Sequence, residues 1–263
     1  MEKLVCVECK GKLVLQNNIL CPLCGALPQK IDLFDSMEEM LQFCLKINRK
    51  IISLRGYFDT LNLPDHDARS QFLAISSTMI MWLIIQLEIY YKHGKTTKSF
   101  IPQRIIKDNP NLSISQITGV MANFDNMNRK SFFVAFMFHV EVFLKSVNRI
   151  LPKVGKDKGY VELMTFILKE LEIANKNEEK HNIMKYSAFV RNSLHNNGIH
   201  TEDNEDGKIY GIHFFFNKGE KVNHGGWRHI YFFCDAILNV IELILKHKLV
   251  GKNFMKSVMT PQI

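Results

Sequence analysis

The sequence contains no internal repeat and no low-complexity segment, which excludes solenoid and propeller architectures and long disordered tracts. Its first residues show no long apolar run behind a basic start, so we expect no signal peptide. Strand patterns are scarce as well, because residues 209–216 form the one convincing strand after the N-terminal region. These absences together predict a mainly α-helical protein of the cytoplasm.

Composition and charge are those of an ordinary globular protein. The chain has 263 residues, of which 46% are hydrophobic and 23% charged, enough for one to three domains with a sizeable core. The formal net charge is +8 when the cysteines are counted as neutral. A basic excess of this size permits nucleic acid as a partner without requiring it.

Four of the six cysteines form two Cys-x-x-Cys pairs near the N-terminus, Cys6 with Cys9 and Cys21 with Cys24. Zinc takes four thiolates in a tetrahedron, and a two-residue gap lets both thiolates of one turn reach the same ion. The eleven residues between the pairs suffice for one short β-hairpin, so the pattern predicts a zinc ribbon over residues 1–30. A redox pair or two disulfides are the alternative. One structural Zn²⁺ with four thiolates lowers the net charge to about +6.

One segment resembles a membrane span, because residues 72–91 contain fifteen apolar residues in twenty. Gln86 and Glu88 lie near one end, and Ser76, Ser77 and Thr78 lie near the middle. A lone spanning helix would bury these polar groups at a cost of several kcal/mol each. We therefore interpret the segment as a helix buried by its neighbours in a bundle, with no membrane partner.

Apolar periodicity and capping signals predict a series of helices after a short linker. Ser36 and Glu39 form a capping box for the first helix, and Pro152 ends the long phenylalanine-rich one. Cys44 and Cys234 lie in apolar helical patterns and are expected in the core. The expected helices span 37–54, 67–92, 128–150, 160–174, 178–196 and 227–248, with a short one beginning near 113–115 and a loop over 94–112.

The C-terminal half carries one further informative string, from Arg191 to Gly198 (RNSLHNNG). Arg191 and His195 are four residues apart, which places a permanent cation and an imidazole on one helical face, with Asn192 beside the arginine. The simplest interpretation is a polar helix end, because Arg and His favour the helix dipole there and Asn-Gly is a common cap.

This string resembles the signature of the HEPN superfamily (higher eukaryotes and prokaryotes nucleotide-binding domains), in which an Arg, usually followed by Asn, precedes a His on one helix. The resemblance covers roughly residues 128–250. It implies a helical bundle in which the Arg and His of two protomers meet across a homodimer interface and cleave RNA without a metal. Carried over to this chain, it implies that Arg191, Asn192 and His195 are the catalytic residues.

The residue types suit that chemistry. Metal-independent RNA cleavage needs a base that takes the proton of the 2′-hydroxyl group, and an imidazole can do this near neutral pH. It also needs a fixed cation that stabilises the negative charge developing on the oxygens of the phosphorane, which is a role for Arg191. DNA would be inert because it lacks the attacking hydroxyl group.

Basic residues gather in two expected loops, where they are candidates for holding phosphates. A solvated charged surface is the alternative interpretation of each group. The first group follows the second helix and the second follows the phenylalanine-rich helix. They comprise Lys92, Lys95, Lys98 and Arg104, and Lys153, Lys156 and Lys158.

We therefore expect a mainly α fold with a β zinc ribbon over 1–30, a helical extension over 31–127 and a HEPN-like bundle with one β-hairpin insertion over 128–263. Two functions compete. One is an RNA-directed endoribonuclease of the toxin or phage-defence type. The other is a non-catalytic module that binds nucleic acid or a protein partner. The Arg191 to His195 spacing, shorter than in the family, favours the second, and the clustering of Arg, His and Asn favours the first.

Overall fold

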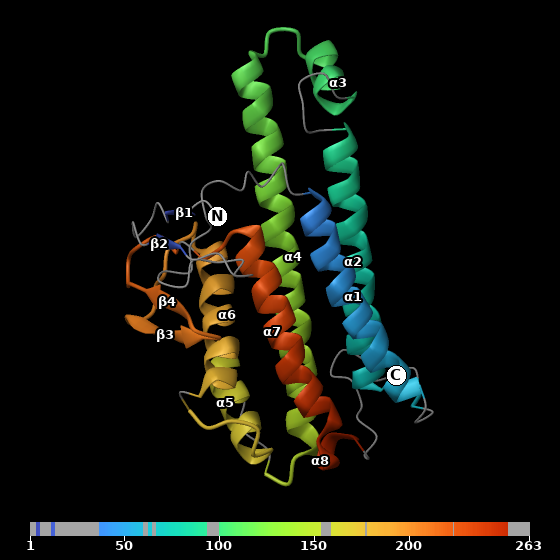
Figure 1. The fold of residues 1–263 in the computed structure, drawn as a ribbon, viewed down its shortest axis with the longest axis vertical. Coiled ribbons are helices and arrows are strands. Elements are labelled where there is room, and N and C mark those ends of the chain that lie inside the picture. Colours follow the sequence, from blue (N-terminus) through green and yellow to red (C-terminus); the bar gives the residue numbers. More distant parts are fainter. Residues whose placement is uncertain are drawn as a thin grey trace.

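The computed structural model describes residues 4–5, 12–13, 37–59, 63–64, 67–93, 100–153, 159–176, 178–222 and 224–251. Within these residues the chain is mainly helical, with two small antiparallel strand pairs (Figure 1). The first pair joins β1 (Leu4–Val5) and β2 (Lys12–Leu13). All four cysteines of the predicted zinc ribbon lie outside the described residues, and so does the Ser36 cap.

The helices α1 (Met37–Asp59) and α2 (Ala68–His93) run side by side (Figure 1). A buried ion pair lies at the start of α2, and its arginine also contacts the C-terminal end of the described chain. Arg69 and Asp67 are fully buried, with Nη2 of Arg69 2.6 Å from Oδ2 of Asp67. The Arg69 guanidinium also donates to the carbonyl oxygen of Val250. A buried cation thus has both a charge partner and a hydrogen-bond acceptor, as burial requires.

The next two helices differ from the expectation. A helix, α3 (Phe100–Asp108), occupies the segment predicted as loop. Pro102 lies in its first turn, where a missing N–H group costs no intrahelical hydrogen bond. The predicted break before residue 128 is also wrong, because α4 (Ile114–Ile150) is one continuous helix. Ser113 caps it and exchanges hydrogen bonds with Gln116.

The remaining helices follow the prediction more closely. They are α5 (Tyr160–Glu170), α6 (Glu179–His195), α7 (Trp227–Lys246) and the short α8 (Lys248–Gly251). The helix α5 ends earlier than residue 174, and Glu172 adopts a left-handed backbone conformation with φ 54°. The predicted left-handed cap after α6 is confirmed, because Asn197 and Gly198 have φ 54° and 86°.

A β-hairpin lies between α6 and α7. Its strands are β3 (Glu205–Ile209) and β4 (Ile212–Phe216), paired from Glu205 with Phe216 to Ile209 with Ile212. The prediction of one strand over 209–216 is therefore wrong, because Ile209 ends β3 and only residues 212–216 form β4. The expected turn over 217–220 is present, with Gly219 at φ 81° and the N–H group of Glu220 donating to the carbonyl oxygen of Asn217. The reversal occurs at Tyr210 and Gly211, with φ 49° and 78°, the geometry of a tight hairpin turn. An aromatic residue at the first turn position concealed this turn in the sequence.

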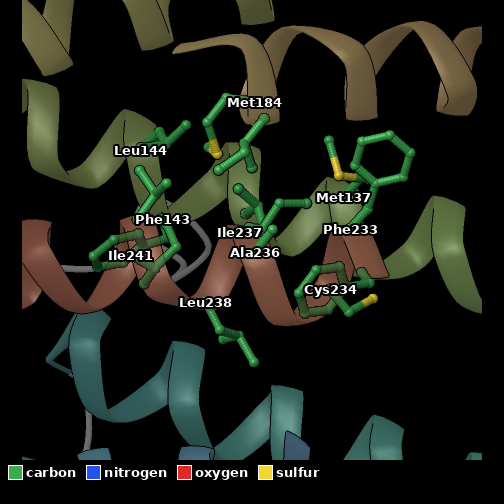
Figure 2. Packing of buried hydrophobic residues seen from close by; sticks show 14 of the residues in the cluster. Met137, Phe143, Leu144, Met184, Phe233, Cys234, Ala236, Ile237, Leu238 and Ile241 are labelled. Carbon is green, nitrogen blue, oxygen red and sulfur yellow. The ribbon is translucent and has the colours of Figure 1, made fainter. Parts of the chain in front are cut away.

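The main core lies where α4, α6 and α7 meet. Figure 2 shows Met137 and Phe143 of α4, Met184 of α6 and Ile237 of α7 converging there. The aromatic rings of Phe133 and Phe233 lie 6.4 Å apart, centre to centre. Cys44 and Cys234 are buried free thiols, as predicted. This core fixes the relative positions of α4 and α6, and so the site described next.

Candidate functional site

The polar string predicted to carry chemistry lies on the last two turns of α6, facing α4. Arg191 spans the gap between the two helices, with its Nη1 atom 3.1 Å from Oε2 of Glu141 on α4. Its guanidinium carbon lies 5.5 Å from the ring centre of Tyr160, the first residue of α5. The side chain of Arg191 is only 19% exposed. Three helices therefore hold this cation in one orientation.

Asn192 continues the network on its other side. Its Oδ1 atom accepts hydrogen bonds from Nε and Nη2 of Arg191, at 3.2 and 3.1 Å. Its Nδ2 atom donates to Oε1 of Glu202 at 2.9 Å. Glu202 belongs to the loop between α6 and β3, so Asn192 links the arginine to that loop.

His195 is different from its neighbours on α6. The side chain is exposed, and in the described part of the chain it makes no hydrogen bond. It belongs to the last turn of the helix, one turn beyond Arg191. The structure therefore places the predicted base and the predicted cation on one helix, but only the cation is held by neighbouring side chains.

The guanidinium keeps hydrogen-bonding capacity in this arrangement. An arginine has five N–H donors, and Glu141 and Asn192 together take three of them among the described residues. One N–H group on each terminal nitrogen is left for a ligand. Two such donors on adjacent nitrogens match two oxygens of a phosphate group.

Glu141 neutralises part of this positive charge. It also pairs with Lys145, one turn further along α4, with 2.9 Å between Nζ and Oε1. Burial alone would raise the pKa of Glu141, but hydrogen bonds from Lys145 and Arg191 outweigh burial and lower the pKa. The carboxylate is therefore ionised at neutral pH, and it orients the arginine.

The loop after α6 is anchored by a buried histidine. The imidazole of His200 lies 5.0 Å from the ring of Phe189 and 5.5 Å from that of Phe216, and Nε2 is 3.0 Å from the carbonyl oxygen of Asp203. His200 is 2% exposed. It thus has a structural role, and it fixes the loop that brings Glu202 to Asn192.

Most of the other predicted site residues cannot be placed. The zinc ligands Cys6, Cys9, Cys21 and Cys24, with Lys95, Lys98, Lys156 and Lys158, lie outside the described residues. Elsewhere, in the described ranges, no cluster of three or more His, Cys, Asp or Glu could hold a metal ion.

The described basic residues do not form one patch. Arg104 lies on α3, before the start of α4, and pairs with Asp108 at 2.9 Å, whereas Lys153 follows the end of α4. The 37 residues of α4 span about 55 Å. Lys92 lies in the last turn of α2, at the end of the molecule that carries α3 (Figure 1).

Sequence reasoning missed Glu141, Lys145, Tyr160 and Glu202 as members of the site. Glu141 and Lys145 are four residues apart, a spacing that predicts an ion pair on one helical face. That spacing gave no sign that the pair would meet α6, because the crossing of α4 and α6 is a tertiary feature.

Comparison of the chain with protein-family models, with curated proteins and with solved structures finds no match in any of the three. Two described helices are long and apolar enough to cross a membrane by length and composition, with windows at Ala68–Tyr90 and Ile114–Ile150. The share of the window that is buried inside the protein is 33% for the first and 56% for the second.

Proposed function

We propose that this chain is an RNA-directed protein of the HEPN-like type, in which Arg191, Asn192 and His195 form a metal-independent endoribonuclease site. The observation that supports the proposal most is the contrast on α6: Arg191 is fixed by Glu141 and Asn192 with donors to spare, and His195 is exposed and free of hydrogen bonds within the described residues. A toxin or phage-defence role in the cytoplasm is part of the proposal.

In this proposal each residue has one task. The two remaining donors of Arg191 bind the scissile phosphate and stabilise its developing negative charge. His195 takes the proton of the 2′-hydroxyl group, whose oxygen attacks the adjacent phosphorus as the bond to the 5′-oxygen breaks, and the 5′-oxygen leaves as a hydroxyl group after taking a proton from water. Asn192 and Glu141 are positioning residues, because they hold the guanidinium without touching the substrate. A homodimer belongs to the proposal, since the resemblance implies that two copies of the site meet.

One observation favours the alternative of a non-catalytic binding module. Carboxylates flank the site, with Glu141 on Arg191 and Glu202 on Asn192. Both would repel an approaching phosphate, so the same network could serve to hold the end of α6 rather than a substrate. The bundle would then bind nucleic acid or a protein partner through another surface.

The test of the enzymatic proposal is cleavage of varied RNAs by the full chain, with EDTA at a concentration that leaves the cysteine-bound zinc in place. We expect cleavage that is blocked by a 2′-deoxy substitution at the cut site. His195→Ala should lower the rate on the order of a hundredfold or more, with RNA affinity nearly unchanged. Arg191→Lys should also lose activity, because it keeps the charge and loses the planar fork.

Matched controls exist on the same chain. Arg149→Lys changes an exposed arginine of α4, and His213→Ala changes a histidine of β4 that pairs with Asp206. Both should cut RNA as the parent does. An inactive parent, or variants of Arg191 and His195 that cut like the parent, would exclude the enzyme, and RNA binding without cleavage would identify the binding module.

The zinc ribbon is proposed as a structural site, because four thiolates in two Cys-x-x-Cys pairs form a standard zinc-binding set. The purified protein should contain about one equivalent of zinc, and strong chelation should change only the first thirty residues while the helical circular dichroism is retained. Metal analysis that finds no zinc, with four titratable thiols in the native protein besides Cys44 and Cys234, would contradict the site.

A further inference from the structure

Large apolar side chains lie exposed along the outer sides of α2 and α4. They occur at helical spacing on each helix, so each set forms one stripe. Phe124 stacks on Tyr90 at 6.3 Å between ring centres, which brings the two stripes side by side. We call this surface the arm face, and it consists of Met81, Trp82, Ile85, Ile89, Phe124 and Met127.

The helix α2 is apolar on more sides than its neighbours cover. The helices α1 and α4 pack against two of its sides, where Ile80, Leu83 and Leu87 are buried. The third side carries Trp82, which is 62% exposed, and three other large apolar residues of the arm face. A helix that is apolar all round is normally buried all round, so this third side is incomplete in the single chain.

The arm face also contains a groove. It has a volume of about 250 Å³ and lies between α2 and α4, with Trp82 and Leu83 on one side and Asn128, Ser131 and Phe132 on the other. A water molecule occupies about 30 Å³ of liquid, so the groove is large enough for a bulky side chain.

The exposed area is that of a protein interface. Large side chains carry roughly 150–250 Å² each, and the six residues are about half exposed, so together they present roughly 600 Å² of apolar surface. The largest apolar patch on an ordinary monomer is roughly 300–600 Å², and each partner in a stable complex buries about 800 Å². The arm face therefore lies at the upper end of the range for monomers and supplies about three quarters of the area that one partner in a stable dimer buries.

We propose that the arm face binds a second copy of this chain, so that α2 and α4 of the two protomers form an antiparallel four-helix bundle. Two-fold pairing brings each patch onto itself, and a patch without charged members meets no like charge when it does so. The formal net charge of +8 opposes association of two copies in general, and an uncharged contact surface adds no further repulsion. The partner's Trp82 is the side chain that we assign to the groove.

A lipid bilayer fits the same surface less well. Gln86, Asn128 and Ser131 line the groove. The hydrocarbon core would remove water from these amide and hydroxyl groups without offering hydrogen-bond partners. A second protein copy supplies both apolar contacts and polar partners.

The contact surface differs from the α6 face through which the sequence-based prediction pairs two protomers. The inference is independent of the proposed RNA site, because it uses no residue of that site. RNA cleavage and arm-face pairing can therefore fail separately.

The test is the mass of the full chain by sedimentation at micromolar concentration. We expect roughly twice the 30.6 kDa of one chain if the arm face alone pairs, and a larger multiple if the α6 face pairs as well. Trp82→Glu and Met127→Glu each place a charge in the middle of the interface and should raise the dissociation constant at least about thirtyfold, the effect of losing an interface hot spot. The control is Leu243→Glu, which changes a residue of α7 that is 43% exposed and outside the arm face.

Trp82 also reports on the unmodified protein. The chain has two tryptophans, and Trp227 is buried, so fluorescence that acrylamide can quench comes mainly from Trp82. Quenching should increase as the dimer is diluted into monomers. A monomer at all concentrations, a dimer that both glutamate variants leave intact, or unchanged quenching on dilution would overturn the proposal. Flotation of the parent with anionic lipid vesicles, lost in Trp82→Glu, would assign the face to a membrane instead.

Discussion

The two halves of α4 differ in sequence and have opposite surroundings, because thirteen of the nineteen residues in 132–150 are apolar, against seven of the eighteen in 114–131. Residues 132–150 contribute ten buried side chains and lie against α5 and α6, whereas residues 114–131 contribute two, Ile117 and Met121. We call the first part, with α5, α6, α7 and the hairpin, the body. We call the second part, with α3 and residues 80–93 of α2, the arm. The arm part of α2 completes the contrast: residues 80–91 contain ten apolar residues in twelve, yet Met81, Trp82, Ile85 and Ile89 are exposed. An apolar helix is thus a core element in the body and an exposed surface in the arm.

The comparison teaches that apolar composition alone does not create a core. The body closes because α5 and α6 pack against α4, and α7 and the hairpin pack against α6, so its aromatic rings contact one another. The arm consists of one end of each of two long helices and the short α3. Such a layer can bury only one side of each helix. Its remaining apolar surface needs a partner outside the chain.

The largest difference should appear between two phenylalanines of α4. Phe136 is fully buried in the body, and Phe136→Ala should lower the free energy of unfolding by about 3–5 kcal/mol through lost burial and a cavity. Phe124 is 42% exposed in the arm, and Phe124→Ala should cost less than about 1 kcal/mol in protein diluted to the monomer. Urea unfolding followed by circular dichroism measures both values, and equal losses would abolish the distinction between body and arm.

Acid should weaken the body through His224. Its ring is fully buried against Phe214, Phe215 and Phe216, and burial lowers its pKa to about 4. The unfolded chain takes up this proton near pH 6.5, so the stabilising effect is complete above that pH and is lost as the pH falls toward 4. The loss amounts to about 3 kcal/mol.

Urea unfolding at pH 7 and at pH 4 checks this effect. His224→Gln removes the titrating group, so the difference between the two pH values should shrink by about 3 kcal/mol relative to the parent. The same pH dependence in parent and variant would show that His224 does not account for the acid sensitivity of the body.

The smallest predicted effects concern two glycines. An alanine Cβ at Gly207 of β3 would lie 2.2 Å from the hydroxyl oxygen of Tyr186, which donates to the carbonyl oxygen of Asp206 at 2.8 Å. Gly207→Ala should therefore cost about 1–3 kcal/mol, because the buried tyrosine must move and lose that bond. Gly56→Ala on α1 meets no atom within 4 Å and should instead stabilise the protein by about 0.5–1 kcal/mol.

Thermal denaturation of the two alanine variants alongside the parent measures both the expected loss and the expected gain of stability. A Gly207→Ala variant as stable as the parent would mean that the hairpin is not held tightly against α6 in the body.

Local sequence signals were sufficient to predict most helices and the polar character of the candidate site. Apolar periodicity predicted α2, α6 and α7 to within two residues at each end, and Asn197-Gly198 predicted the left-handed cap after α6. These features depend on neighbours along the chain, which the sequence contains directly. Arg191 and His195 were likewise selected as candidates from their spacing on one helical face, with Asn192 beside the arginine.

The structure alone decided how these elements meet. It showed the α3 helix, the unbroken α4 and the reversal at Tyr210 and Gly211, because packing and strand pairing can outweigh local propensity. It also brought Glu141 of α4 to Arg191, fifty positions away in the chain, and left Trp82 and Met127 exposed on the arm. Both outcomes depend on the crossing of helices distant in sequence, and no periodicity within one helix specifies which helix will cover it.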